Sequence, residues 1–494
     1  MKLKKLLNKI KNSLKIMKPF LTLMLISVLV SCQSPESKNP NIILIMADDQ
    51  GWGDVGYNGH PHLKTPHLDA MAKNGAVFSH FYSAGSVCSP TRASVMTGRH
   101  PARMDICNAN CGHLKDQEIT LAEMVKEKGY RTGHFGKWHL GTLTRDVLDA
   151  NRGGRKENDI HYAPPWDHGF DVSFVTESKV PTWDPMITPP QNAEDVKASL
   201  KEGQHFGTYY WKGPGLQAIE NLWGDDSRVI MDRVIPFIEE SVTQDQAFLS
   251  IIWFHTPHLP VLAGEKYKSP YAQHSEGQQH YYGVISAMDE QVGRLTNKLK
   301  SLGVADNTLV FYTSDNGPET SVQVRDQNIP YGRAQGITKG LRGRKRSLYE
   351  GGIRVPGIAL WPGKIKAGTQ IDTPCITSDY FPTIAHVLGI DLNKYQRFYD
   401  GENLIPYWQG KKQKRSKPLA FQFGKQYALI DNQYKMYGVS DGSIELFDLL
   451  NDPSELKDLS KVEPALLNRL MTVYQDWKTT VQISQSGGDY LKKN

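Results

Sequence analysis

Residues 41–49 have the sequence NIILIMADD, in which a run of six apolar side chains is followed directly by two aspartates. A continuous apolar run of this length, rich in isoleucine, is typical of a strand buried on both faces of a parallel sheet. In open α/β sheets, ligands bind beyond the carboxyl ends of such strands. The stretch therefore predicts a buried parallel strand that brings Asp48 and Asp49 to a ligand-binding edge.

Further apolar segments alternate with helical patterns along the chain. Gln246–Phe254, Thr308–Ser314 and Ala76–Phe81 are predicted strands. Tyr281–Leu302 has apolar residues at the spacing of a helix. Shorter helices are predicted where cap residues and glycines bracket a segment: Thr65–Gly75, Pro90–Gly98 and Thr120–Gly129. This alternation predicts an α/β fold with a mainly parallel sheet flanked by helices.

Two later parts of the chain have a different pattern. Residues 144–226 are rich in Gly, Pro, Trp and charge, so we expect a largely irregular insertion there, of the kind that is functional or mobile. Val462–Thr479 is a predicted closing helix. An antiparallel meander is predicted from four short strands before it: Leu419–Phe423, Tyr427–Ile430, Lys435–Val439 and Glu445–Asp448. We therefore predict a catalytic domain over residues 41–389 and a smaller C-terminal α+β subdomain over 390–494.

The N-terminal segment has the pattern of an export signal. Residues 1–31 contain seven lysines and no acid, and the apolar run Phe20–Val30 is too short to span a membrane comfortably. Leu29-Val30-Ser31-Cys32 resembles a bacterial lipoprotein cleavage box, which predicts lipidation of Cys32. Residues 32–40 would then be a tether from the membrane, and the protein a lipoprotein of a bacterial cell envelope. Plain secretion with cleavage nearby is the alternative.

Charge and cysteine content limit the function classes. Without the seven lysines of the N-terminal segment the formal net charge falls from +6 to −1, so charge gives no support to a nucleic-acid partner. Cys107 and Cys111 could form a disulfide on an exported route, but the sequence leaves this open. Cys375 lies in an apolar stretch and is predicted to be a buried thiol.

Polar clusters directly follow four of the apolar segments. They are Asp48-Asp49, Lys137-Trp138-His139, His255-Thr256-Pro257-His258 and Asp315-Asn316-Gly317. If the four segments are neighbouring parallel strands, the clusters meet at one edge of the sheet. Each cluster alone could be a solvated loop. Asp48, Asp49, Asp315 and Asn316 offer only oxygen ligands, so together they predict a hard cation, for which calcium fits best.

The segment Ser86-Val87-Cys88-Ser89-Pro90-Thr91-Arg92 precedes an apolar pair and Thr97-Gly98. Cys88 lies at the start of a predicted short helix, and Arg92 lies about one turn further on. From the residues alone, this pattern indicates a thiolate of low pKa, an anion-binding turn or a buried structural cysteine.

The same segment resembles the signature of the formylglycine-dependent sulfatases. The resemblance extends over nearly all of residues 40–460. Gly129–Gly141 resembles the second signature of the family, and Val304–Gly317 and Glu350–Gly363 resemble galactosamine-6-sulfatases and arylsulfatase A. The chain departs from the pattern at His67, where Asn is more usual, and at Phe135, where a smaller residue is. The resemblance implies an alkaline-phosphatase-like fold and a maturation enzyme that converts Cys88 to formylglycine (3-oxoalanine).

A position-by-position match to the family also implies roles for individual residues. Arg92 and Lys137 would steady the hydrated aldehyde and the metal site, and His139 would accept a proton. Lys137, His258 and Lys345 would contact the substrate, the last two countering charge on the leaving oxygen. The calcium ligands would be Asp48, Asp49, Asp315, Asn316 and the modified Cys88.

The export signal favours a carbohydrate substrate over a small cytosolic ester. We expect an exo-acting sulfatase for algal polymers such as ulvan or carrageenan, or for glycosaminoglycan oligosaccharides. The alternatives are a phosphodiesterase or phosphonate monoester hydrolase of the same superfamily, which His258 and Lys345 argue against, and a non-catalytic sugar-binding lipoprotein. The basic loop Glu319–Arg346 would be a cationic rim or a solvated loop, and Lys411–Lys417 a solvated loop.

Overall fold

A computed structural model describes residues 3–5, 39–190, 200–319 and 335–490 of the chain. Pro40–Asn494 form one compact unit. All of the predicted signal peptide (residues 1–31) except residues 3–5, the lipidation site Cys32 and most of the tether lie outside the described residues. Within the described ranges, no helix is both long and apolar enough to cross a membrane.

A ten-stranded sheet runs through this unit. Its strands are, from one edge to the other, β12 (Thr369–Ile371), β2 (Ala76–Phe78), β11 (Gly357–Leu360), β9 (Thr308–Ser314), β1 (Asn41–Ala47), β8 (Phe248–Trp253), β4 (Arg131–Lys137), β5 (Val172–Thr176), β6 (Trp211–Gly213) and β7 (Leu216–Gln217). The five strands from β9 to β5 are parallel to one another. Every residue of β1 is buried, which confirms the prediction from its apolar run.

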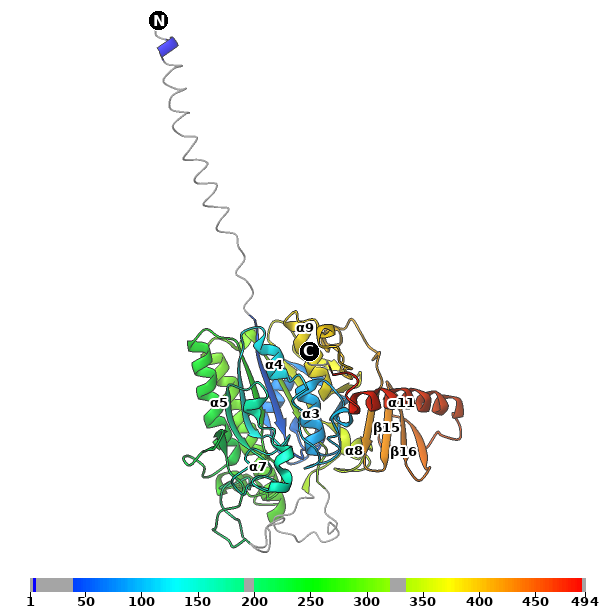
Figure 1. Cartoon of the computed structure of the whole chain (residues 1–494), viewed down its shortest axis with the longest axis horizontal. Helices are drawn as coiled ribbons and strands as arrows, with labels where there is room; N and C mark the ends of the chain where they lie inside the picture. The colour runs from blue at the N-terminus through cyan, green and yellow to red at the C-terminus, as the bar shows by residue number, and fades with distance from the viewer. Residues whose placement is uncertain (1–2, 6–38, 191–199, 320–334, 491–494) are drawn as a thin grey trace. The chain divides into compact units, whose positions relative to one another are not determined.

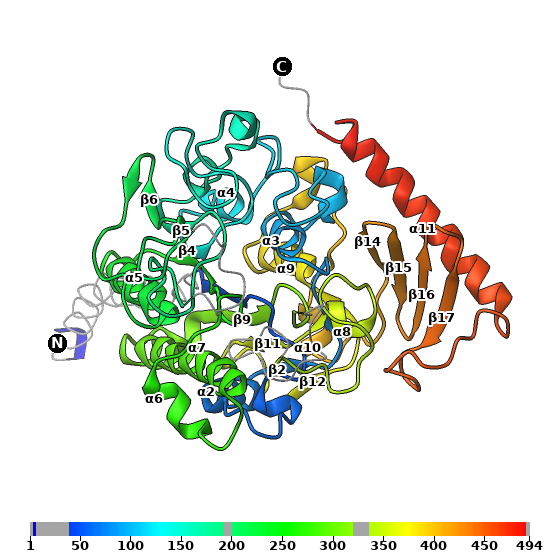
Figure 2. The same cartoon turned by 90° about the horizontal axis from the view of Figure 1, so that it is seen from below.

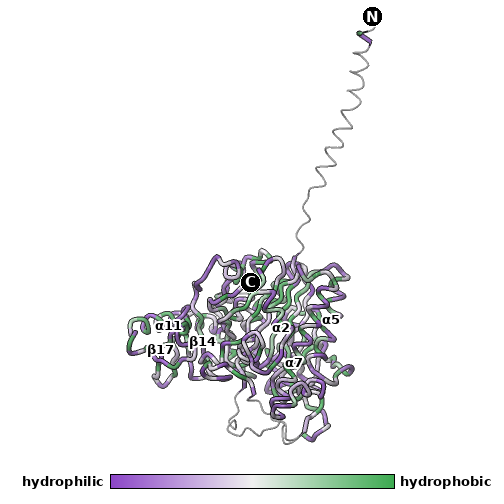
Figure 3. The backbone as a smooth tube through the Cα atoms, turned by 180° about the vertical axis from the view of Figure 1, so that it is seen from behind, coloured by the Kyte–Doolittle hydropathy of each residue, from purple (hydrophilic) through white to green (hydrophobic). Residues whose placement is uncertain are grey.

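Alternate side chains of β1 face two layers of helices, because successive residues of a strand point to opposite faces. Ile42, Leu44 and Met46 pack in a core with helices α3 (Cys88–Thr97), α4 (Leu121–Lys126) and α9 (Tyr380–Val387). Ile43 and Ile45 pack in a second core with α2 (Pro66–Asn74), α5 (Asp226–Thr243) and α7 (Glu276–Ser301). Figure 2 shows the two layers of helices on opposite sides of the sheet. In Figure 3, hydrophobic segments (green) run through the middle of the compact unit. The α/β fold with a sheet flanked by helices is thus confirmed.

The C-terminal part contains a separate antiparallel sheet. Its strands, in spatial and sequence order, are β14 (Leu419–Phe423), β15 (Gln426–Asp431), β16 (Tyr434–Val439) and β17 (Ile444–Asp448). Helix α11 (Pro464–Gln485) packs on one face of it through Leu470 and Tyr474, as Figure 1 shows. The predicted meander and closing helix are therefore present, with the helix longer than expected. Cys375 is fully buried, as predicted.

One local prediction was wrong, and the sequence did not reveal several elements. Residues 144–226 are largely irregular, as predicted, but they contain strand β5, which extends the parallel part of the sheet, and the short strands β6 and β7. Helix α5, which starts at its end, was not predicted. Ala76–Phe81 is not one strand, because the chain turns after β2 and places β3 (Phe81–Tyr82) in a small sheet with β10 (Arg354–Val355) and β13 (Cys375–Ile376). Strands β3 and β5 are short, so their own apolar patterns were too weak to show against polar and glycine-rich flanks.

Candidate active site

The polar clusters after β9, β1, β8 and β4 meet at one edge of the sheet, because these four strands are consecutive parallel neighbours. The backbone N–H of Asp48 donates to the Thr256 carbonyl over 2.9 Å, and that of Asp315 donates to the Ala47 carbonyl over 3.1 Å. Asp49 and His139 adopt left-handed backbone conformations, with φ of 67° and 56°. Such conformations are uncommon outside glycine and gather at functional sites.

Cys88 is the first residue of α3 and points into this edge. Its Sγ lies 3.4 Å from Oδ1 of Asp48, and its side chain is buried. Burial raises the pKa of the Cys88 thiol, and the carboxylates of Asp315 and Asp48 raise it further. The interpretation as a thiolate of low pKa is therefore wrong for the unmodified residue, since a neutral thiol is a poor nucleophile.

Three cations neutralise the three carboxylates of the site. All six side chains are almost completely buried, so each charge needs a partner. The N–O distance is 2.6 Å in each pair: Arg92 with Asp315, Lys137 with Asp48, and Lys345 with Asp49. The guanidinium of Arg92 also lies 5.1 Å from the centroid of the Trp253 ring. The site is thus an array of alternating charges with fixed positions.

Oxygen atoms suited to a hard cation lie within this array. Oδ1 of Asn316 is buried and has no hydrogen-bond partner in the described part of the chain. Its Nδ2 donates to Oδ1 of Asp49 over 2.7 Å, so the amide oxygen lies at the carboxylates. Ligand atoms of Asp48, Asp49, Cys88 and His258 fall within 4.8 Å of one another. Carboxylates with one amide oxygen are the ligand set of calcium, so the residues present fit that ion.

His258 and Lys345 both lie near the Asp49 carboxylate. Nε2 of His258 lies 3.8 Å from Asp49, while its Nδ1 bonds the Leu259 carbonyl at 2.9 Å. Burial and the nearby lysines lower the pKa of His258 well below its ordinary value, so the imidazole is neutral. Burial alone would lower the pKa of Lys345, but Asp49 and Glu319 raise it well above the ordinary value. Because the Leu259 carbonyl can only accept, Nδ1 of His258 carries the hydrogen and Nε2 the lone pair, so the site offers a neutral acceptor and a fixed cation next to each other.

His139 is the second histidine of the site. Its carbonyl accepts a hydrogen bond from Ser89 Oγ at 2.7 Å, which ties it to the start of α3. Nε2 lies 3.0 Å from Oδ1 of Asn110. Burial and then the charge of Lys137 lower the pKa of His139 well below its ordinary value. A neutral, buried imidazole of this kind can act as a proton acceptor.

All the predicted site residues of the described chain therefore gather at one place, and sequence reasoning missed two of their neighbours. Trp253 ends an apolar strand, so nothing distinguished it from a core residue. Asn110 lies in a loop closed by a disulfide between Cys107 and Cys111, a pairing that the sequence left open. No sequence signal linked this loop to His139. The His255 ring bonds Asp226 through Nδ1 and Thr176 through Nε2, and in this way it supports the residues of the site.

Comparisons with known proteins agree with this site. The Sulfatase family profile matches residues 40–390, and the profile described as N-sulphoglucosamine sulphohydrolase, C-terminal, matches residues 343–473. Human arylsulfatase A is 30% identical over 460 residues, covering 87% of this chain and 81% of that protein. Dog N-acetylgalactosamine-6-sulfatase is 31% identical over 389 residues, covering 75% of this chain and 66% of that protein.

A solved structure shows the same fold. The crystal structure of Ps i-CgsB in complex with k-i-k-neocarrahexaose matches with a TM-score of 0.76 and 27% identity. The match covers 92% of this chain and 96% of that chain. The family profile and the sequence relatives identify the same enzyme class. The chain belongs to the sulfatase family, whose members are sulfuric ester hydrolases, and it is such an enzyme.

Proposed function

We propose that this enzyme cleaves sulfate monoesters of an anionic carbohydrate and that Cys88, converted to formylglycine, supplies the nucleophile. One observation carries the proposal: Cys88 Sγ lies 3.4 Å from Asp48, within a buried set of three carboxylates and three cations. The hydrate of the aldehyde would supply one hydroxyl to attack sulfur and a second that allows the sulfate to leave. Calcium held by Asp48, Asp49, Asp315, Asn316 and modified Cys88 would supply positive charge that orients the ester.

The residues of this chain would do the remaining work. Arg92 and Lys137 hold Asp315 and Asp48 in place and keep positive charge beside the nucleophile. His139 would accept the proton released from the hydrate. A sulfate monoester carries one negative charge, and more develops on its leaving oxygen in the transition state. Lys345 would stabilise that charge as a preorganised donor in a buried site, and His258 would contribute once its Nε2 carries a proton.

The substrate class follows from the relatives and the predicted export route. Ps i-CgsB was solved with a carrageenan hexasaccharide, and another relative is named for N-acetylgalactosamine 6-sulfate. We therefore propose exo action on a sulfated polysaccharide or oligosaccharide, either algal or of the glycosaminoglycan class. A lipid anchor at Cys32 would hold the enzyme at a bacterial cell envelope.

The direct test is the mass of the peptide that contains Cys88, after expression with a maturation enzyme. Conversion of the thiol to the aldehyde lowers this mass by about 18 Da. Matched aryl sulfate and aryl phosphonate esters then separate sulfatase from phosphonate hydrolase activity. An unmodified cysteine despite competent maturation, or a preference for the phosphonate, would overturn the proposal.

Calcium is expected to stabilise the folded protein as well as support turnover. A ligand that binds only the native state at about 100 times its Kd stabilises it by about 2.7 kcal/mol. Adding Ca²⁺ to chelator-treated protein should raise the midpoint of thermal unfolding, and Mg²⁺ at equal concentration should raise it less. Asn316→Ala should lose most of this response, whereas Asp441→Asn, at an exposed turn, should keep it. Equal midpoints with and without Ca²⁺ would exclude the site.

Lys345→Met is expected to lower kcat/KM for a sulfate ester by roughly 10²–10³-fold, the usual effect of removing one charge-stabilising donor. The side chain is 3% exposed and lies 2.6 Å from Asp49, so the lost charge cannot be replaced by solvent. Lys339→Met is the matched control, because Lys339 lies in the same loop but is exposed and, among the described residues, its ammonium group bonds only the Gly59 carbonyl. Steady-state kinetics of both variants test this, and equal effects would contradict the assigned role.

A further inference from the structure

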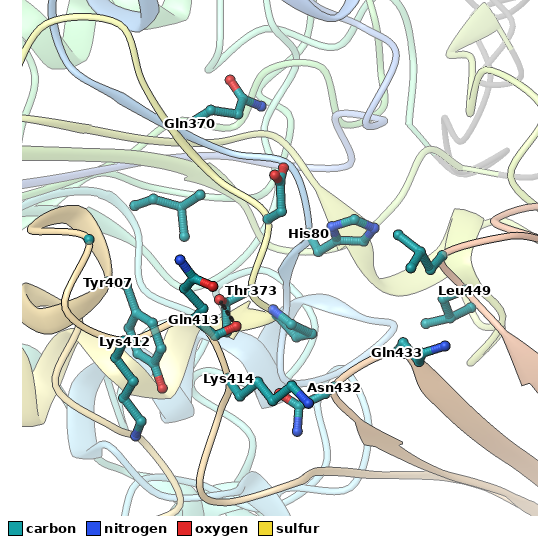
Figure 4. Close-up of a pocket in the computed structure, with 15 residues that line it drawn as sticks. His80, Gln370, Thr373, Tyr407, Lys412, Gln413, Lys414, Asn432, Gln433 and Leu449 are labelled. Atoms are coloured by element: carbon teal, nitrogen blue, oxygen red, sulfur yellow. Dashed lines mark hydrogen bonds between the residues drawn. The ribbon is translucent and has the colours of Figure 1, made fainter.

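A cavity of ≈ 500 Å³ lies between the edge of the main sheet and the C-terminal sheet (Figure 4). Its volume is in the range of small-molecule sites, about 300–1,000 Å³. The segment after β12, the loop 410–414 and the turn 432–433 line it. The residues proposed for catalysis are not among those that line it.

The loop that carries two lysines of this cavity is held rigidly. Arg415 is buried and donates to both oxygens of Asp379, at 2.7 and 2.6 Å. The side chain of Asn432 accepts from the Arg415 N–H at 2.7 Å, and Thr373 Oγ donates to the Gln413 carbonyl at 2.8 Å. The prediction of a solvated loop over 411–417 is therefore wrong at Arg415. These contacts fix the backbone that presents Lys412 and Lys414 at the cavity.

Apart from the carboxylate of Asp372, which accepts a hydrogen bond from Ser79, the side chains of the cavity suit a ligand with hydroxyl and anionic groups. Lys414 makes no ion pair or hydrogen bond with any residue that the structure describes, and it lies beside Asn432 in Figure 4. Lys412 pairs with Glu402 at 2.7 Å. Amide groups of Gln370, Gln413 and Gln433 also line the cavity. Amides bond hydroxyls as donor and acceptor, and ammonium groups bind sulfate or carboxylate.

The cavity is distinct from the catalytic site. Strand β15 begins at Gln426, whose Nε2 donates to the Arg346 carbonyl, next to Lys345. Asn432 of the cavity follows the other end of the same strand. A strand rises about 3.3 Å per residue, so the six residues separate these two points by about 20 Å. One small ester cannot occupy both places, but a polymer can.

We propose that this cavity is an accessory binding site for an anionic oligosaccharide segment, remote from the sulfate ester that is cleaved on the same polymer. This rests on the proposed function. Binding a second segment raises the effective concentration of the chain at the catalytic site. The accessory site would therefore favour polymeric over small substrates.

Lys414→Glu tests the site, with Lys411→Glu as the matched control. Lys411 is exposed on the same loop and undergoes the same charge change, but does not line the cavity. An ion pair of this kind contributes up to about 1 kcal/mol, or roughly fivefold in affinity. Chondroitin sulfate and κ-carrageenan serve as polymer probes in affinity electrophoresis, and an aryl sulfate serves as the small substrate.

Lys414→Glu should weaken retardation by at least one polymer about fivefold, and Lys411→Glu should not. Where that polymer is also cleaved, its kcat/KM relative to the aryl sulfate should fall to a similar extent. Equal effects of the two variants, or no binding of either polymer by the parent protein, would overturn the accessory site. If no sulfate ester is hydrolysed while Lys414 still controls polymer binding, the proposed function fails and the accessory site stands.

A second, independent observation concerns His139. An amide oxygen can only accept, so the 3.0 Å contact with Oδ1 of Asn110 places a hydrogen on Nε2. The lone pair then lies on Nδ1, which is buried and has no partner in the described chain. Asn110 itself has a left-handed φ of 59° and lies inside the disulfide loop of Cys107 and Cys111.

We infer that Asn110 is a positioning residue that fixes the tautomer of His139, and that the disulfide loop holds Asn110 in place. Without this contact the ring could turn or carry its hydrogen on Nδ1. Partners of this type typically change activity by about 10–100-fold when removed. The effect should fall on kcat rather than KM, because Asn110 bonds the imidazole and is not among the proposed substrate contacts.

Asn110→Ala should therefore lower kcat about 10–100-fold, while Asn108→Ala, an exposed position in the same loop, should not. In Asn110→Asp the carboxylate would stabilise the imidazolium and raise the pKa of His139. Because the base must be neutral, the acidic limb of the kcat–pH profile should move to higher pH. An unshifted profile in Asn110→Asp, or kcat within twofold of the parent in Asn110→Ala, would overturn the role.

Discussion

Cys88→Ala is expected to lower the turnover of sulfate esters by at least about 10⁴-fold, the scale on which enzymes lose activity when a nucleophile is removed. Alanine cannot be converted to an aldehyde, so this variant lacks the proposed nucleophile. Cys88→Ser is informative as well, because serine offers one hydroxyl and lacks the second one that lets sulfate leave. Both variants should be compared with the parent under single-turnover conditions.

Cys375→Ala is the matched control for this experiment. Cys375 is also a fully buried free thiol, but it lies in β13 and bonds the Thr373 carbonyl. Its removal should leave turnover within a few-fold of the parent. A similar loss of activity in both alanine variants, with both proteins folded, would point to a general effect of emptying buried space and would contradict a special role for Cys88.

The part of the site that follows parallel strands could be predicted from the sequence. Continuous apolar runs predicted β1, β8 and β9, and sheet geometry then placed the polar residues after them at one edge. Asn316 was predicted to be an oxygen ligand in this way. The prediction succeeded because a strand buried on both faces leaves a long, unambiguous apolar run.

The parts that could not be predicted depend on contacts between distant segments. Nothing in the sequence around Asn110 indicates that a loop closed by a disulfide contacts His139. Arg415 stands in a run of lysines, so its burial could not be distinguished from exposure without knowing that Asp379 lies opposite. Strand β5 is short, and the polar segments on either side hid its pattern. Local sequence does not encode these pairings, which only the packed chain defines.

The buried ion pair between Arg415 and Asp379 leads to the largest expected effect on stability. Asp379 is fully buried and accepts four hydrogen bonds: two from Arg415, one from the Ile376 N–H at 2.8 Å and one from the Glu402 N–H at 2.6 Å. Asp379→Ala leaves the guanidinium buried without its partner. Breaking a buried pair in this way costs about 3–5 kcal/mol. The midpoint of urea unfolding should fall accordingly.

Glu290→Ala is the control, because it removes the acid of an exposed ion pair with Lys266. Pairs of that kind contribute about 0–1 kcal/mol, so this variant should unfold close to the parent. Replacing Arg415 by Met in the Asp379→Ala background should recover part of the loss, since the uncompensated charge is then gone. If the single variant Asp379→Ala unfolds at the same urea concentration as Glu290→Ala, the pair does not hold the 411–417 loop. In that case Lys414 would lack its fixed position, and the accessory cavity would lose its structural basis.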